Sequence, residues 1–193
     1  MIDYLKGTLT QITPAFVNIE TAGVGYFVNI SLTTFSKLEG KTDYKLLVHE
    51  VIREDSHQLF GFADSGEREI FRLLISVTGV GASTARMMLS SLNPAEIERA
   101  IIGSDVNGLK SVKGIGLKTA QRIIVDLKDK LGKHAGTGEI FAAGDNTKRE
   151  EALSALVMLG FAKSAVSKVL DKICGEEKGL TVEDLIKRAL KNL

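Results

Sequence analysis

Apolar and polar positions alternate in short runs over about the first third of the chain. Four of these runs, YLKGTLTQI, AFVNIET, YFVNIS and YKLLVHEVI, are rich in β-branched and aromatic residues, and QLFGF supplies a fifth. Alternation with this composition predicts β-strands. Five short strands within residues 1–63 favour a small closed barrel of the OB-fold type, and a split sandwich is the alternative.

The apolar spacing changes to that of helices after the predicted barrel. Asp64 and Glu67 form an N-cap and N3 pair ahead of the apolar run REIFRLLISV. Asn93 and Glu96, with a proline between them, mark a second helix start. Residues 64–131 are therefore predicted to form a helical domain.

A loose segment and a second helical region follow. Residues 132–146, GKHAGTGEIFAAGDN, are rich in glycine, alanine and polar residues, which is typical of a flexible linker. Helical spacing returns in residues 147–193, where Thr181 caps the last apolar run and Asp184 occupies N3. The apolar stripe expected on the first of these helices, which ends at Gly160, comprises Ala152, Leu153, Leu156, Val157 and Leu159.

Three short helices in so few residues predict a UBA-like bundle. A bundle of this size is marginally stable by itself and often serves to bind another protein. The chain is thus expected to be an α+β protein of several domains. The candidate partner-binding residues in its last domain are Leu156, Leu159, Gly160 and Phe161.

A duplicated segment lies within the central helical region. LISVTGVGASTA, which begins at Leu74, recurs as LKSVKGIGLKTA from Leu109, with both glycines in register. Eight such matches indicate a repeated helix-hairpin-helix unit. In each copy a Gly-x-Gly hairpin precedes a helix whose first N–H groups have no partner within the helix, so a phosphate oxygen fits there.

The duplicated hairpins supply the candidate DNA-binding residues. Val80 and Ile115, between the two glycines, are expected to point inward and anchor each hairpin. Contacts of this kind bind backbone phosphates and do not read base sequence. The alternative is that the glycines only turn a corner between packed helices. The candidates are Gly79, Val80, Gly81, Ser83, Thr84 and Arg86 in the first copy, and Lys113, Gly114, Ile115, Gly116, Lys118, Thr119 and Arg122 in the second.

Charge is distributed unevenly, although the whole chain carries a net charge of only +1. Residues 1–63 hold five Lys/Arg against seven Asp/Glu, whereas residues 106–134 hold seven Lys/Arg against two Asp/Glu. Nucleic-acid binding would therefore depend on local arrangement. The acids of the first segment include Glu54 and Asp55, adjacent in the predicted turn REDSH between two strands.

Other functional classes find little support in the sequence. A nucleotide-binding P-loop would need another glycine spacing and a strand before the loop. The three histidines lack metal-ligand spacing, and no nucleophile and base form a recognisable motif. We expect no cofactor, no metal and no catalytic residue. The single cysteine, the lack of an apolar run of roughly 18 residues and the lack of a secretory signal favour a cytoplasmic protein.

The combination of these features resembles the RuvA family, the DNA-binding subunits of bacterial Holliday-junction branch-migration complexes. The resemblance rests on the barrel, the acid-tipped REDSHQLFGF, the paired hairpins, the linker and the three-helix tail. It covers the whole chain and includes GVGY at 23–26 and GFADSGER at 61–68.

The resemblance implies a non-catalytic scaffold for homologous recombination and DNA repair. It implies a homotetramer, or an octamer, that holds a four-way junction open and planar, with Glu54 and Asp55 forming an acidic pin near the centre. It also implies that residues 147–193 bind the hexameric ATPase RuvB and that the nuclease RuvC shares the junction. One departure is Ser83, which stands where the second hairpin has Lys118. A general helix-hairpin-helix repair adaptor and a metal-dependent nuclease are the alternatives.

Overall fold

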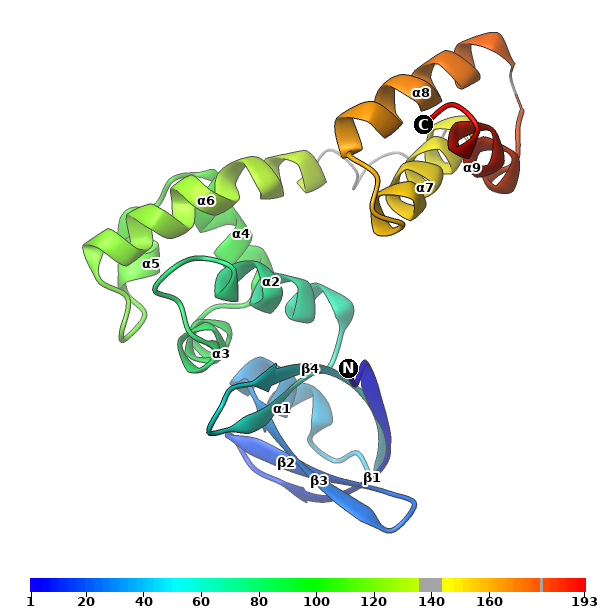
Figure 1. Cartoon of the computed structure of the whole chain (residues 1–193). Coiled ribbons are helices and arrows are strands. Elements are labelled where there is room, and N and C mark those ends of the chain that lie inside the picture. Colours follow the sequence, from blue (N-terminus) through cyan, green and yellow to red (C-terminus); the bar gives the residue numbers. More distant parts are fainter. Residues whose placement is uncertain (136–143, 178) are drawn as a thin grey trace. The chain divides into compact units, whose positions relative to one another are not determined.

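The structure is a computed structural model that describes residues 1–135, 144–177 and 179–193. The chain divides into two compact units, Met1–Gly136 and Thr137–Leu193 (Figure 1). No helix among the described residues is long and apolar enough to cross a membrane.

The first unit begins with a closed barrel, which confirms the barrel over the split sandwich. Neighbouring strands pair in the order β1-β2-β3-β5-β4, and the sheet closes between β4 and β1. All pairings are antiparallel except that of β3 with β5, which is parallel. The strands are β1 (Tyr4–Ile12), β2 (Phe16–Thr21), β3 (Val24–Ile30), β4 (Asp43–Ile52) and β5 (His57–Phe62).

A helix that the sequence analysis did not anticipate lies between β3 and β4. Helix α1 (Leu32–Leu38) is capped by Ser31, whose hydroxyl accepts a hydrogen bond from the amide of Thr34. Thr34 and Leu38 are fully buried, so the helix packs into the barrel. The segment was missed because it has only seven residues and no acid in its first turn.

Five helices follow the barrel in the chain (Figure 1). They enclose a core that Phe60 and Phe62 of β5 join, whereas the inside of the barrel holds a separate core. Phe71 of the first of these helices is fully buried, and its ring centroid lies 5.2 Å from that of Phe60 and 4.9 Å from that of Phe62, both on β5. Burying one such side chain stabilises the fold by roughly 1.5–3 kcal/mol. The helices are α2 (Ser65–Ile75), α3 (Ala82–Ser91), α4 (Pro94–Ile102), α5 (Val106–Lys110) and α6 (Leu117–Ala135).

A buried carboxylate joins α2 to α1. Asp64 caps α2 as expected, accepting a hydrogen bond from the amide of Glu67 at 2.9 Å. The Glu67 side chain is fully buried and accepts hydrogen bonds from the hydroxyls of Ser31 and Thr34. Burial raises the pKa of Glu67 above its ordinary value, although the two hydroxyls oppose the rise. Lys37 of α1 pairs with Asp64 and adds a second link between these helices.

The expected linker overlaps both neighbouring helices. Helix α6 continues to Ala135, and α7 (Gly144–Met158) already begins at Gly144. The remainder of the expected linker, residues 136–143, lies outside the described residues. The expected boundaries at 131 and 147 therefore fall within helices. The two helical ends, GKHA and GDN, contain one glycine each, which a helix tolerates at a cost of about 1 kcal/mol.

The second unit is a bundle of α7, α8 (Lys163–Glu176) and α9 (Val182–Leu190) among the described residues. Thr181 caps α9 as expected, accepting from the amide of Asp184. The predicted stripe on α7 was partly wrong, because Val157 is 39% exposed and Leu159 is 63% exposed. The residues of its buried core are Ala152, Leu156, Val166, Leu170, Ile173, Leu185 and Ala189.

Candidate nucleic-acid interface

The first hairpin joins α2 to α3. The amide of Val80 donates to the carbonyl of Val77 at 3.0 Å, and Gly79 between them has a φ of +93°. Val80 is only 5% exposed, which confirms that it points inward. Gly81 is the N-cap of α3 and has no side chain that could cap the helix. The first amides of α3 therefore have no N-cap side chain to which they could donate a hydrogen bond.

The second hairpin, between α5 and α6, repeats this geometry. The amide of Ile115 donates to the carbonyl of Val112 at 3.1 Å, and Gly114 also has a φ of +93°. Ile115 is 5% exposed and belongs to the same core as Val80. Two segments with matching residues thus adopt matching backbones within one compact unit.

The two glycines of each hairpin have different reasons to be glycine. Gly79 and Gly114 occupy the left-handed region, where a side chain would strain the backbone. Gly81 and Gly116 do not have a positive φ, and a Cβ at either position would meet nothing within 4 Å. Neither conformation nor packing requires glycine there. The space in front of each helix N-terminus is open at this second glycine.

Positive charge gathers around the second hairpin. Lys113 and Lys118 are exposed on either side of its glycines. Arg122, one turn further along α6, reaches across to donate to the carbonyl of Thr78 in the first hairpin at 3.4 Å. The two hairpins are therefore in direct contact through this side chain. Thr119 is half-buried at the start of α6.

The first hairpin is more neutral and is attached to the barrel. Ser83 is exposed and Thr84 is half-buried in the first turn of α3. Arg86, expected to grip phosphate, instead uses Nη1 to donate to the carbonyl of Ala15 and to Oδ1 of Asn29, both at 3.0 Å. The guanidinium is thereby held against the barrel.

The acidic turn lies at the tip of the β4–β5 hairpin. The amide of Arg53 donates to the carbonyl of Ser56 at 2.8 Å, and Glu54 and Asp55 are exposed between them. Beneath the tip, His57 and Glu50 form a hydrogen bond of 2.7 Å, which lowers the pKa of Glu50. The sequence analysis did not predict this Glu50–His57 pair, because the cross-strand register of β4 and β5 brings the two residues together. It braces the base of the acidic tip.

A second basic cluster lies beside α2 and was also missed. Arg68, Arg72 and Lys130 line a cavity of about 500 Å³. Burial and the two arginines lower the pKa of the neighbouring His49. Arg68, however, is paired with Asp3 at 2.7 Å, so much of its charge is already compensated.

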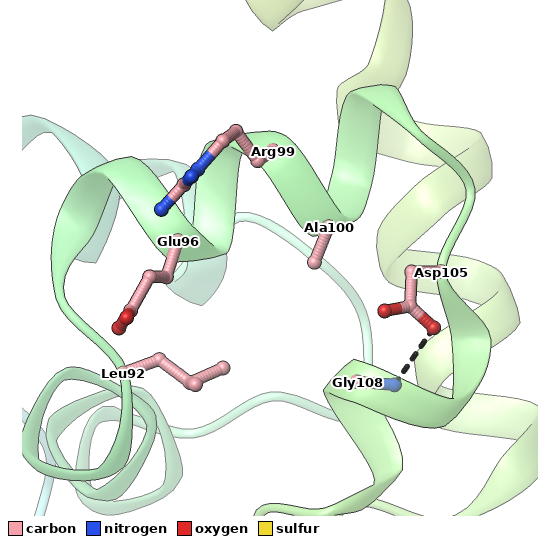
Figure 2. A pocket seen from close by; sticks show the side chains of 6 residues that line it. All are labelled: Leu92, Glu96, Arg99, Ala100, Asp105 and Gly108. Atoms are coloured by element: carbon pink, nitrogen blue, oxygen red, sulfur yellow. Dashed lines mark hydrogen bonds between the residues drawn. The ribbon is translucent and has the colours of Figure 1, made fainter.

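A cavity of about 340 Å³ near α4 and α5 has no comparable chemistry (Figure 2). Glu96 accepts from the amide of Asn93 at 2.8 Å, and Asp105 accepts from that of Gly108 at 2.9 Å. Its acids therefore cap helices. No cluster of metal-ligating side chains occurs in the part of the chain that the structure describes.

Comparison with known proteins identifies the family. A model described as RuvA N terminal domain matches residues 1–61, one described as SAM-like Helix-hairpin-helix tandem matches 71–129, and one described as RuvA, C-terminal domain matches 147–193. A relative from Christiangramia forsetii is 54% identical over 193 residues, covering 100% of both chains. The chain belongs to the RuvA family.

Further RuvA relatives agree over their full length. Those from Bacteroides thetaiotaomicron and Flavobacterium psychrophilum are 51% and 49% identical, again over 100% of both chains. All three relatives are named Holliday junction branch migration complex subunit RuvA. The expected fold, with an N-terminal barrel, a central helix-hairpin-helix domain and a C-terminal helical domain, is confirmed.

The RuvA C-terminal domain exposes part of the apolar set expected to bind a partner. Leu156 is fully buried, so its proposed role in direct contact is wrong, and its role is to hold the core. Leu159 is 63% exposed and Phe161 is 36% exposed on either side of Gly160, whose φ is +100°. Met158, which the sequence analysis overlooked, is 86% exposed. The position of Met158 in the last turn of α7, just before Gly160, could have indicated that its side chain is exposed.

Proposed function

We propose that this chain is the junction-binding subunit of a Holliday-junction branch-migration complex. The observation that carries the proposal is the pair of matching hairpins in one compact unit, each with a glycine at φ +93° ahead of a helix whose N-cap glycine has no capping side chain. Full-length relatives that bear the name of this subunit support it.

The hairpins bind backbone phosphates. Helix N-termini carry partial positive charge and free N–H donors, and Lys113 and Lys118 add full charges beside the second. Because phosphates are alike at every base pair, binding is independent of sequence. Two linked hairpins contact both strands across one groove of a duplex arm.

The acidic tip supplies selectivity for four-way DNA. In a homotetramer with four-fold symmetry, four copies of Glu54 and Asp55 surround the crossover. Phosphates are crowded at that point, and carboxylates increase the local repulsion. The repulsion disfavours stacked junctions and a continuous duplex across the centre, while the outer hairpins hold the arms. An octamer would enclose the junction from both sides.

The C-terminal bundle recruits the motor. Met158, Leu159 and Phe161 present an exposed apolar surface on a small domain, which suits docking of another protein. The partner is RuvB, the hexameric ATPase, and ATP hydrolysis takes place there, so this chain is not itself an enzyme. RuvC binds the same junction, and the complex works in the cytoplasm.

The decisive experiment is a binding competition with the full chain. A labelled four-way junction is challenged with an unlabelled junction of unrelated sequence and with linear duplex of equal length. We expect the unrelated junction to compete equally and the linear duplex to compete at least about tenfold less well. Equal competition by linear duplex would make the chain a general repair adaptor. Cleavage of the junction in Mg²⁺, or release of phosphate from ATP, would support an enzyme instead.

Motor recruitment has its own test in the full chain. Leu159→Asp introduces a charge into the exposed apolar surface. The matched control is Ser154→Asp, which places the same charge on an exposed polar position of α7. Leu159→Asp is expected to abolish ATP-driven branch migration with RuvB while junction affinity stays at the parent value. Normal migration by Leu159→Asp would rule out this surface as the docking site.

A further inference from the structure

The first hairpin is connected to the acidic tip by side-chain hydrogen bonds. Arg86 of α3 donates through Nη1 to Oδ1 of Asn29 on β3, at 3.0 Å. The same Asn29 donates through Nδ2 to the carbonyl of Leu59 on β5, at 3.2 Å. Leu59 lies in the strand that leads directly out of the Glu54–Asp55 turn. A continuous path therefore runs from α3, the helix after the first hairpin, to β5, the strand that follows the acidic turn.

The chemistry of the path fixes its geometry. An arginine can only donate and a backbone carbonyl can only accept, so the Asn29 amide has just one orientation that satisfies both neighbours. The second hydrogen of Arg86 Nη1 goes to the carbonyl of Ala15, which also accepts from the amide of Ile30 at 3.1 Å. Both Nη1 hydrogens are thus committed to the barrel, and this fixes the plane of the guanidinium.

Two further bonds clamp the same helix to α1. The amide of Leu32 donates to the hydroxyl of Ser90 at 3.1 Å, and the hydroxyl of Thr33 donates to the carbonyl of Leu89 at 2.7 Å. By contrast, none of the hydrogen bonds of α6 among the described residues reaches the barrel. Its side-chain bonds go to Thr78 and Ser104. The attachment is specific to the first hairpin.

We propose that Arg86, Asn29 and the Leu59 carbonyl form a relay that holds the first hairpin at a fixed position relative to the acidic tip. Arg86 is then a positioning residue for junction selectivity and not a phosphate ligand. The proposal rests on the proposed function. Attraction at the hairpin and repulsion at the tip act on the same DNA, so selectivity depends on their separation. A loosened α3 allows the hairpin to hold a linear duplex clear of the acids.

The test separates this role from a phosphate contact. Arg86→Met removes the donors and the charge, whereas Arg86→Lys keeps the charge but cannot reproduce the planar fork. The relay predicts that both variants lose preference for four-way over linear DNA by about tenfold. The slope of log K against log salt is expected to stay at the parent value. Asn29→Ala is expected to give the same loss, and the Asn29→Ala/Arg86→Met double variant no further loss.

A phosphate contact predicts a different pattern. Arg86→Met would then reduce the salt slope by about 0.9, Arg86→Lys would restore it, and Asn29→Ala would act additively. Any of these three results overturns the relay. Arg99→Met is the matched control, since the Arg99 Nε bonds only to the carbonyl of Ala95 in its own helix, at 3.3 Å.

The control variant should keep the parent's preference. Thermal unfolding of each variant shows whether it folds. If Arg86→Met does not fold, Arg86→Lys and Asn29→Ala alone test the relay. A parent chain without preference for four-way DNA overturns the proposed function and the relay together. A selective parent whose relay variants remain equally selective overturns the relay alone.

Discussion

The two hairpins share a backbone but differ in what surrounds them. Both have a glycine at φ +93° and a buried aliphatic residue next to it. The second is flanked by Lys113 and Lys118, whereas the first has Ser83 in the position of Lys118 and is bound to the barrel through Arg86. We propose a division of labour between them, in which the second hairpin supplies most of the attraction for phosphate and the first supplies alignment.

The largest effect is expected from a side chain placed over each helix N-terminus. Gly116→Val adds no backbone strain and has open space around its Cβ, so folding should be unchanged. It should nevertheless weaken junction binding by at least about tenfold, because the side chain keeps phosphate away from the amides. Gly81→Val should reduce junction affinity by a smaller factor, since the first hairpin carries less positive charge. The measurement is a binding titration beside a thermal melt.

The neighbouring glycines provide the matched control. Gly79→Val and Gly114→Val force a β-branched residue into the left-handed region and should each destabilise the fold by about 1–3 kcal/mol. Equal binding losses for Gly81→Val and Gly116→Val would contradict the division of labour. Unchanged binding by a folded Gly116→Val would contradict the phosphate contact itself.

Exchanging the charge between hairpins should give the next largest effect. Lys118→Ser should lower affinity for all sequences alike and make the salt slope shallower by about 0.9. Ser83→Lys should make the slope steeper by a similar amount. Both residues are exposed, so stability should change by less than about 0.5 kcal/mol. Salt titrations of four-way and linear DNA test this, and a loss that varies with DNA sequence would exclude contact with the backbone alone.

Neutralising the acidic tip should have a smaller effect of opposite sign. The Glu54→Gln/Asp55→Asn double variant keeps side-chain size and should bind linear duplex several-fold more tightly at low salt, because central repulsion is removed. Preference for four-way DNA should fall accordingly. Glu54→Lys/Asp55→Lys should extend both changes. Weaker binding of both DNA forms by the neutral variant would mean that the carboxylates make favourable contacts.

The smallest effect concerns the anchoring of α2, which leads into the first hairpin. The pKa of Glu67 is raised above 4.5 in the folded state by burial. Between the ordinary and raised values the folded state holds more protons than the unfolded state, so the free energy of unfolding falls as pH rises through that range. The difference between the parent and Glu67→Gln should therefore favour the parent more at pH 4.5 than at pH 7.5. Denaturant melts at both values measure it, and a constant difference would mean that Glu67 does not titrate.

The sequence predicted the elements with strong local signals. Strand alternation, the Asp64 and Asn93 caps and the repeated glycines all appear in the structure as expected. Local pattern did not indicate α1, which is short and depends on burial of Thr34 and Leu38 against the barrel.

Long-range side-chain contacts account for the rest of what was missed. Arg86 reads as a basic residue beside a hairpin, and only the packing of α3 on the barrel shows its bonds to Ala15 and Asn29. Leu156 similarly fits an apolar stripe, but burial in the bundle separates it from the exposed Leu159. Periodicity identifies which residues are apolar, and tertiary packing decides which of them remain at the surface.

Hydrogen exchange of the full chain with and without a saturating four-way junction tests the central claim most directly. The first amides of α3 and α6 have no acceptor within their helices, so they should exchange rapidly in the free protein and slowly once phosphate oxygens occupy them. We predict slower exchange in peptides covering 78–86 and 113–122, larger in the second, with none in 163–176. Unchanged exchange at both hairpins while the junction remains bound would contradict the account.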